Sequence, residues 1–232
     1  MKQWVKMPSD WIKDGEGTKL RSLKWQGEEK SDYIAALMLY LIFVHHANDE
    51  ITTQFDEVGR CSITYDALLA ITGLSKAKIS GGIQVLKSLE LILVLQNGNR
   101  NVYVVKNYGE FSGWAKLPAK RLYSRSMSEL SVFQNFKLRS KVELNALKIY
   151  LLILALRNNH SNAASVSYEK ISTYTGVARN DIRKALSFLV TQGLVHVDQH
   201  STEINEYSTS SRYRPCFIDA YKHQGTSGRV PK

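Results

Sequence analysis

The sequence predicts a mostly α-helical protein with small β-hairpins, built as two tandem copies of one module. Residues 63–92 and 166–195 align without a gap at an offset of 103. The segment WVKMP at 4–8 recurs 110 residues later as WAKLP. In both copies, apolar residues at helical spacing are followed by strand-like runs. A chain of 232 residues accommodates two domains of ordinary size, which we expect at 1–108 and 109–232.

Each copy begins with a short strand and a long apolar helix. In the first copy, residues 4–7 are strand-like and Ser9-Asp10 can start a helix after Pro8. The long helix is expected at 33–46, capped by Asp32, and its counterpart at 145–157. A helix that is hydrophobic nearly all round must be buried on several sides. It forms the centre of one domain or, in addition, the face of a homodimer.

The two copies differ in length within one connection. Residues 48–62 correspond to 158–165, so the second copy lacks seven residues there. A polar loop is where a duplicated domain best tolerates such a change.

Both aligned repeats have the pattern of a helix, a tight turn and a second helix. Gly73 and Gly176 supply the turn, because glycine adopts left-handed backbone angles without steric cost. In each second helix three apolar residues recur at helical spacing. These are Ile79, Ile83 and Leu86 in the first copy and Ile182, Leu186 and Leu189 in the second. We expect them to be buried and the opposite face to be exposed.

A β-hairpin is predicted after each repeat. Asn97-Gly98 lies between strand-like runs at 91–95 and 101–105, and this dipeptide is typical of a two-residue turn. The second hairpin is less regular, with a strand at 194–197 and a return strand at 212–214 after a polar stretch. A hairpin after a helix-turn-helix is a wing, so each copy is predicted to be a winged helix-turn-helix domain. The composition after residue 224 is that of a flexible tail.

The formal net charge of +10 suggests an anionic partner, and double-stranded DNA fits the helix-turn-helix pattern. The charge is uneven: residues 1–108 contain 13 basic and 12 acidic side chains, whereas 109–232 contain 18 and 9. We therefore expect the second copy to anchor the protein on DNA.

Candidate DNA-contacting residues follow from the 100° step of a helix, which turns them away from the buried positions. On the second helix of the first repeat they are Lys76, Lys78, Ser80 and Gln84. On that of the second repeat they are Arg179, Asn180, Arg183, Lys184 and Ser187. Arginine can pair with guanine and asparagine with adenine, so the second set should read most of the sequence. Outside these helices the candidates are Arg100 at the first hairpin tip, Lys120, Arg121, Arg212 and Arg214.

Catalytic, metal and membrane signatures are absent from the sequence. There is no GxxxxGK[ST] loop, and Cys61 and Cys216 lack zinc-site spacing. His45 and His46 are adjacent on a helix, should point to different faces, and are interpreted as helix-end residues rather than metal ligands. The longest apolar run, 34–44, is too short to span a membrane. We expect a cytoplasmic DNA-binding protein that is not an enzyme and has no cofactor.

The tandem layout, in which each copy opens with W-x-K-[ML]-P, resembles the replication initiators of plasmids and related mobile elements. The first copy is also similar to the amino-terminal domain of phage replisome organisers. The resemblance implies binding to repeated sites at an origin and contact with host replication proteins. Two alternatives stay open: a winged-helix transcriptional repressor, and a structural adaptor of a chromosome-condensing complex. The sequence leaves the DNA target and the oligomeric state undetermined.

Overall fold

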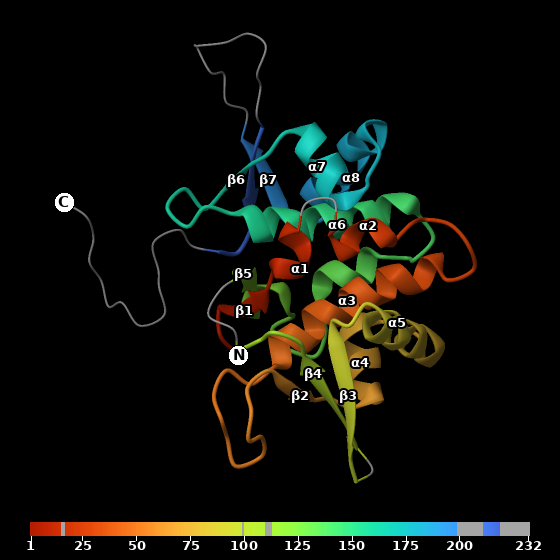
Figure 1. Cartoon of the computed structure of the whole chain (residues 1–232), viewed down its shortest axis with the longest axis vertical. Coiled ribbons are helices and arrows are strands. Elements are labelled where there is room, and N and C mark those ends of the chain that lie inside the picture. The colour runs from red at the N-terminus through yellow and green to blue at the C-terminus, as the bar shows by residue number, and fades with distance from the viewer. Residues whose placement is uncertain (15–16, 99, 110–112, 199–210, 219–232) are drawn as a thin grey trace, which may run out of the picture.

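A computed structural model describes residues 1–14, 17–98, 100–109, 113–198 and 211–218 (Figure 1). It contains helices joined to small antiparallel sheets, as expected. The first half holds β1 (Trp4–Pro8), α1 (Asp10–Lys13), α2 (Lys19–Ser22), α3 (Lys30–His46), β2 (Arg60–Ser62), α4 (Tyr65–Thr72), α5 (Lys76–Ser88), β3 (Ile92–Asn97) and β4 (Arg100–Val105). The second half holds β5 (Trp114–Pro118), the 3₁₀ turns η2 (Lys120–Leu122) and η3 (Ser131–Asn135), α6 (Lys141–Leu156), β6 (Ala164–Ser165), α7 (Tyr168–Thr175), α8 (Arg179–Thr191), β7 (Val195–Asp198) and β8 (Arg212–Pro215).

The long helices α3 and α6 lie side by side in the middle of the molecule, with α5 packed on α3 and α8 on α6 (Figure 1). Every residue of α3 from 34 to 45 is buried within the chain, which accounts for its apolar character. The helix starts at Lys30, so Asp32 lies inside its first turn rather than at the cap. Helix α6 also starts earlier than expected, because Ser140 and Glu143 form a capping box.

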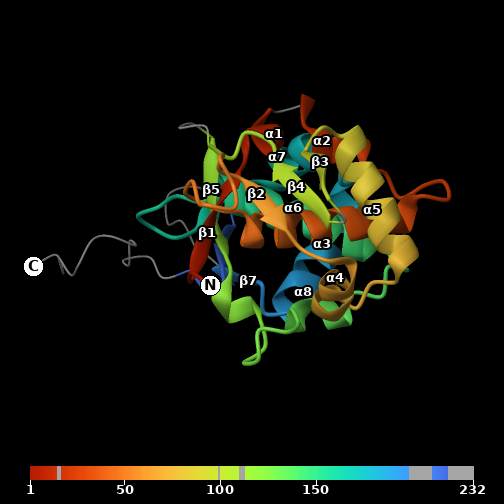
Figure 2. The same cartoon turned by 90° about the horizontal axis from the view of Figure 1, so that it is seen from below.

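Strands β1 and β5 pair with each other and so join the two halves (Figures 1 and 2). Lys6 lies opposite Lys116, Trp4 opposite Pro118, and Pro8 opposite Trp114. Because Pro118 and Trp114 correspond to Pro8 and Trp4 at the 110-residue offset, this antiparallel register is symmetric. The strands are therefore related by an approximate twofold axis through the Lys6–Lys116 pair.

The tryptophan and lysine of the repeated W-x-K motif stabilise the two-stranded ribbon that β1 and β5 form. The rings of Trp4 and Trp114 stack with centroids 6.1 Å apart. Lys116 Nζ lies 4.6 Å from the Trp4 centroid, and Lys6 Nζ lies 5.7 Å from that of Trp114. Each ammonium thus faces the negative face of an aromatic ring from the other half. Burial, together with the charge of Arg157, lowers the pKa of Lys116.

The segments before the two long helices, which we name the first arm (residues 1–29) and the second arm (109–139), each contact the opposite half. In the first arm, the Thr18 hydroxyl donates to the carbonyl of Tyr174 at the end of α7. In the second arm, the Leu130 N–H donates to the Ile71 carbonyl near the end of α4, at 2.9 Å. One apolar core runs through both halves. The domain boundary at 108 stays a prediction, but these contacts cross it.

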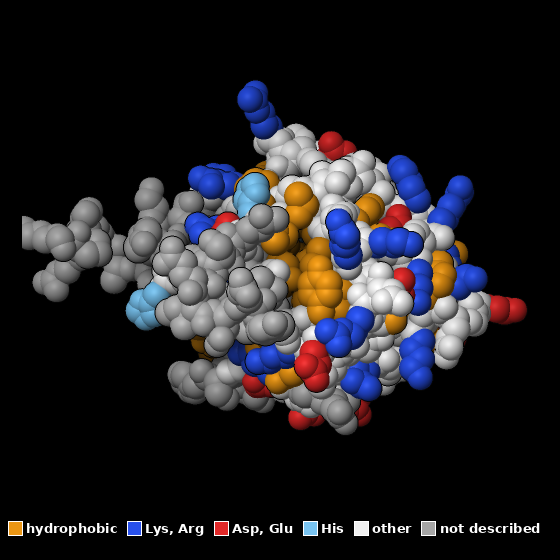
Figure 3. Space-filling model, turned by 90° about the horizontal axis from the view of Figure 1, so that it is seen from above, with side chains coloured by type: hydrophobic (Ala, Val, Ile, Leu, Met, Phe, Trp, Pro, Cys, Tyr) orange, Lys and Arg blue, Asp and Glu red, His pale blue; other side chains and the backbone are white. Residues whose placement is uncertain are grey.

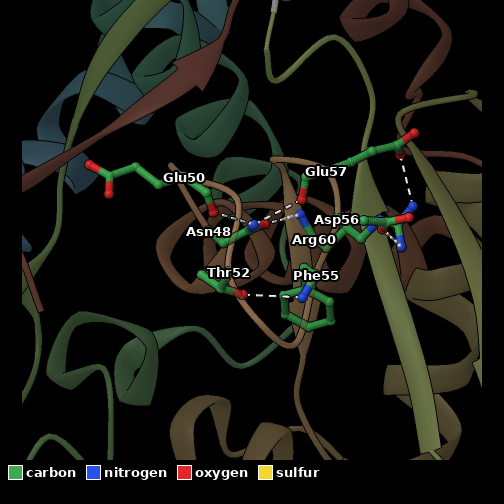
Figure 4. A network of polar contacts seen from close by, with 7 residues as sticks. All are labelled: Asn48, Glu50, Thr52, Phe55, Asp56, Glu57 and Arg60. Atoms are coloured by element: carbon green, nitrogen blue, oxygen red, sulfur yellow. Dashed lines mark hydrogen bonds and ion pairs between the residues drawn. The ribbon is translucent and has the colours of Figure 1, made fainter.

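The length difference between the copies lies where the alignment put it. Asn48 N–H donates to the Arg60 carbonyl across the longer loop, and Asn158 N–H donates to the Ala163 carbonyl across the shorter one. In the longer loop the Asn48 amide also donates to the Glu57 carbonyl, and its oxygen accepts from Arg60 N–H at 2.7 Å (Figure 4). Asn48 and Asn158, which correspond at the 110-residue offset, therefore each close one of the two connections.

Strands β3 and β4 form the expected first hairpin, but its turn is shifted by one residue. Asn97 pairs with Arg100, so Asn97 belongs to strand β3 and not to the turn in which it was expected. This register keeps the buried residues Ile92 and Val105 opposite each other. In the second half β7 and β8 pair as expected. The stretch that connects them at 199–210, and the tail predicted from 224, lie outside the described residues.

Each hairpin is extended by a short strand that the sequence analysis did not predict. Strand β2 pairs with β4, and β6 pairs with β8, so both sheets have three strands. These strands immediately precede α4 and α7, and they fix the base of each hairpin beside its helix-turn-helix.

Candidate nucleic-acid interface

The turns between the paired helices are nearly identical in the two halves. Helix α4 ends at Gly73 with φ of 71°, and α7 ends at Gly176 with φ of 67°. The preceding residue is threonine in both copies. The Thr72 hydroxyl donates to the Leu68 carbonyl and accepts from the backbone N–H beyond the glycine, and Thr175 does the same. The repeated Thr-Gly pair thus sets the angle at which α5 and α8 leave the turn.

Helices α5 and α8 bury the faces predicted from their spacing. Their expected core residues are at most 5% exposed: Ile79, Ile83, Leu86, Ile182, Leu186 and Leu189. The opposite face of α8 is exposed at every candidate position: Arg179, Asn180, Arg183, Lys184 and Ser187.

The cations of α8 are not neutralised by described neighbours. No ion pair between described residues involves Arg179, Arg183 or Lys184. The acidic residue of the same helix, Asp181, is paired instead with Lys141 at 2.7 Å. Lys and Arg side chains are spread over the face of the molecule that includes α7 and α8 (Figure 3). This face can attract a polyanion.

The first arm adds positive charge beside the second helix-turn-helix. Arg21 lies so close to Gly176 that a Cβ added there would be 3.5 Å from the arginine Cα, and its guanidinium donates to the Thr173 carbonyl. Burial, together with the charges of Arg21, Lys141 and Lys24, lowers the pKa of Lys148 to about 7. Sequence reasoning missed Arg21 and Lys24, because their place depends on contacts about 150 residues away along the chain.

The corresponding face of α5 carries little free charge. Ser80 and Gln84 are exposed as expected. Lys76 lies 4.0 Å from the Asp66 carboxylate, and Lys78 turns back onto α3, where its Nζ lies 2.7 Å from Asp32 Oδ1. Of the candidates on α5, Ser80, Gln84 and the largely exposed Lys76 are thus left to face a groove.

The remaining candidates are not gathered around α8. Lys120 and Arg121 lie on η2, next to β1, where Lys120 N–H donates to the Lys2 carbonyl at 3.2 Å. Arg100 is exposed at the first hairpin, and Arg214 is paired with Asp198 at 2.8 Å. Arg212 lies opposite Asp198 in the second hairpin.

His45 is buried and His46 is exposed, as expected of neighbours that point to different faces, but both rings reach the same group. The Tyr123 hydroxyl lies 3.2 Å from His45 Nδ1 and 3.3 Å from His46 Nε2. Burial lowers the pKa of His45 to about 3, so the ring is neutral. Its Nε2–H donates to the Pro118 carbonyl at 2.9 Å, which leaves Nδ1 to accept from Tyr123. The pair therefore ties the second arm to the end of α3.

No protein-family model, curated protein or solved structure matches the chain. Among the described residues, no helix combines the length and apolarity needed to cross a membrane. A functional assignment therefore rests on the chain's own geometry and charge.

Proposed function

We propose that the protein binds double-stranded DNA through two winged helix-turn-helix units and acts as an origin-binding replication initiator of a mobile element. The observation that supports DNA binding most directly is the exposed face of α8. Arg179, Arg183 and Lys184 lie there with no ion-pair partner among the described residues, on the second helix of a helix-turn-helix. In this motif the second helix enters the major groove.

The two recognition helices take unequal parts in this proposal. Helix α8 offers arginine and asparagine, which can each make two hydrogen bonds to one base, at about 1–3 kcal/mol of discrimination per good pair. Helix α5 offers Gln84 and Ser80 and contributes weaker contacts. Because the proposed partner is chromosomal or plasmid DNA, the protein is proposed to act in the cytoplasm.

The initiator role, including contact with host replication proteins, rests on the tandem duplication and the repeated W-x-K motif. A winged-helix repressor uses the same DNA-binding surface. DNase footprinting on the DNA that flanks the protein's own gene separates the alternatives. An initiator protects several repeated sites, a repressor protects one operator near a promoter, and an adaptor protects nothing.

Binding should depend steeply on salt. Each phosphate contact contributes about −0.9 to the slope of log K against log salt, so a handful of contacts predicts a slope of roughly −4 to −8. On a selected duplex, Arg183→Ala should reduce specificity for cognate over scrambled DNA by about 1–3 kcal/mol, and Gln84→Ala should reduce it less. Fluorescence anisotropy at several salt concentrations measures both quantities.

A slope near zero would exclude electrostatic DNA binding. If Gln84→Ala costs more specificity than Arg183→Ala, the assignment of the two helices is reversed. If Arg183→Ala weakens cognate and scrambled duplexes equally, Arg183 contacts phosphate rather than bases.

A further inference from the structure

The second arm passes directly over the helix-turn-helix of the first half. The Leu130 N–H bonds to the Ile71 carbonyl in the last turn of α4. A few residues further on, Gln134 Oε1 would lie 3.4 Å from a Cβ added to Gly73. The arm therefore borders the turn between α4 and α5, although the two segments are about 60 residues apart in sequence.

A pocket of about 420 Å³ lies between this turn and the arm. One wall is formed by Thr72, Gly73, Leu74, Ser75 and Lys78 with Ser31, and the other by Phe133, Gln134, Phe136, Lys137, Leu138 and Arg139. Lys78 is neutralised by Asp32, as described above. Lys137 and Arg139 are exposed, and no ion pair between described residues involves either of them. The pocket thus has two uncompensated positive charges on its arm side.

The acidic residue nearest to these cations along the chain positions their backbone and does not neutralise their side chains. Glu143 is buried, and its carboxylate accepts from the backbone N–H groups of Lys137 (2.6 Å) and Arg139 (2.9 Å). The same carboxylate completes the capping box of α6. Lys137 and Arg139 are therefore held by a rigid turn at the edge of the pocket.

A helix-turn-helix brings its first helix across the DNA backbone and the start of its second helix to the groove. Cations beside the turn are then close to phosphates. The first half has few of its own, because Lys78 is paired with Asp32 and only Lys76, which lies 4.0 Å from Asp66, is largely exposed. The second arm is rich in them, with six basic and two acidic residues at 109–139.

We infer that Lys137 and Arg139 of the second arm bind phosphates of the DNA that the first helix-turn-helix contacts. This inference rests on the proposed function and adds a composite site, in which one half supplies the recognition helix and the other supplies the backbone contacts. Two of the nine excess positive charges of the second half then contact DNA bound by the first half.

The test compares two double variants of the full chain. Lys137→Ala/Arg139→Ala removes the proposed contacts. Lys106→Ala/Arg125→Ala removes the same charge from exposed positions near the other end of α3, which is about 25 Å long. Arg125 is close in sequence to Tyr123, whose hydroxyl contacts His45 near the end of α3. Lys106 is close in sequence to Tyr108, whose hydroxyl donates to Asp49 just beyond α3. Thermal unfolding confirms that both variants are folded.

Loss of two phosphate contacts should reduce the salt slope by about two units, so the fall in affinity between 50 and 200 mM salt should be about tenfold smaller than in the unmodified protein. The control variant should keep the original slope. In hydroxyl-radical footprints, Lys137→Ala/Arg139→Ala should weaken protection at the end of the site that Gln84→Ala also alters.

Two results would overturn the inference while leaving DNA binding intact. One is a salt slope in Lys137→Ala/Arg139→Ala equal to that of the control. The other is a footprint change at the end altered by Arg183→Ala, which would mean that the arm serves its own half. If the unmodified protein shows no salt-dependent binding to any duplex, the proposed function itself fails.

Discussion

Lys148 has an unusual position for a charged residue, because it lies in α6 at the junction of the two halves and is only 3% exposed. Its Nζ donates to the Leu23 carbonyl of the first arm at 2.9 Å. The pKa near 7 lies well below the usual lysine value of 10.5, so the folded protein binds this proton more weakly than the unfolded chain does. Its contribution to stability is therefore greatest above pH 10.5 and is lost as the pH falls towards and through 7.

Replacing Lys148 by methionine tests this dependence, since Met38 is the corresponding residue of the first half. From pH 7 to pH 9 the free energy of unfolding of the unmodified protein should rise by about 2 kcal/mol relative to Lys148→Met. Urea unfolding at several pH values measures the difference. Loss of the bond to Leu23 shifts all values of the variant equally, so only the slope decides. Parallel pH profiles would show that Lys148 is not desolvated.

At the scale of elements, α3 and α5 approach closely because Gly81 and Gly82 face α3. A Cβ at Gly82 would lie 2.9 Å from the Ala36 backbone nitrogen and 2.8 Å from Leu39 Cδ1. A Cβ at Gly81 would meet only the end of the Asp32 side chain, at 2.6 Å or more. The two glycines are therefore predicted to differ in their tolerance of substitution, although they are adjacent.

Gly82→Ala should destabilise the protein by about 1–3 kcal/mol, because overpacking against backbone outweighs the gain of about 1 kcal/mol in helix propensity. Gly81→Ala should change stability by less than about 1 kcal/mol, since that gain is offset only by disturbance of the partly exposed Asp32–Lys78 pair. Urea unfolding of both variants gives the comparison. Equal effects would mean that the helices separate easily at this contact.

The elements that local sequence determines were predictable. The Thr-Gly turns and the buried faces of α5 and α8 follow from glycine conformation and helical period, and the exposed cations of α8 follow from the same 100° step. The capping box at Ser140 and Glu143, which sets the start of α6, is a local pattern of the same kind. The pairing of β1 with β5 was not predictable, because the recurrence of a motif does not reveal its partner. For the same reason the sequence did not place Arg21 or Lys137 beside the opposite helix-turn-helix.

At the scale of the whole molecule, the two halves share one core, one two-stranded sheet and exchanged arms. A fragment cut at residue 108 loses the partner of β1 and the cover that η3 gives to the end of α4. These are long-range contacts that no segment of the first half replaces.

We therefore expect residues 1–108 alone not to form a stable monomer. Circular dichroism and urea unfolding should show a broad or absent transition, whereas mixing with 109–232 should restore a cooperative one. An isolated 1–108 that unfolds cooperatively as a monomer, as the predicted domain boundary implies, would show that the arms are dispensable.

The symmetric ribbon also has a consequence for the newly synthesised chain. Strand β1 leaves the ribosome about 110 residues before β5 does, and the stretch that covers α4 follows later still. Until then Trp4 has no aromatic neighbour from the other half, and one edge of β1 is unpaired. Cotranslational folding of the first half is therefore delayed until much of the second has been translated, and slow translation before β5 would prolong the exposure of an aggregation-prone edge.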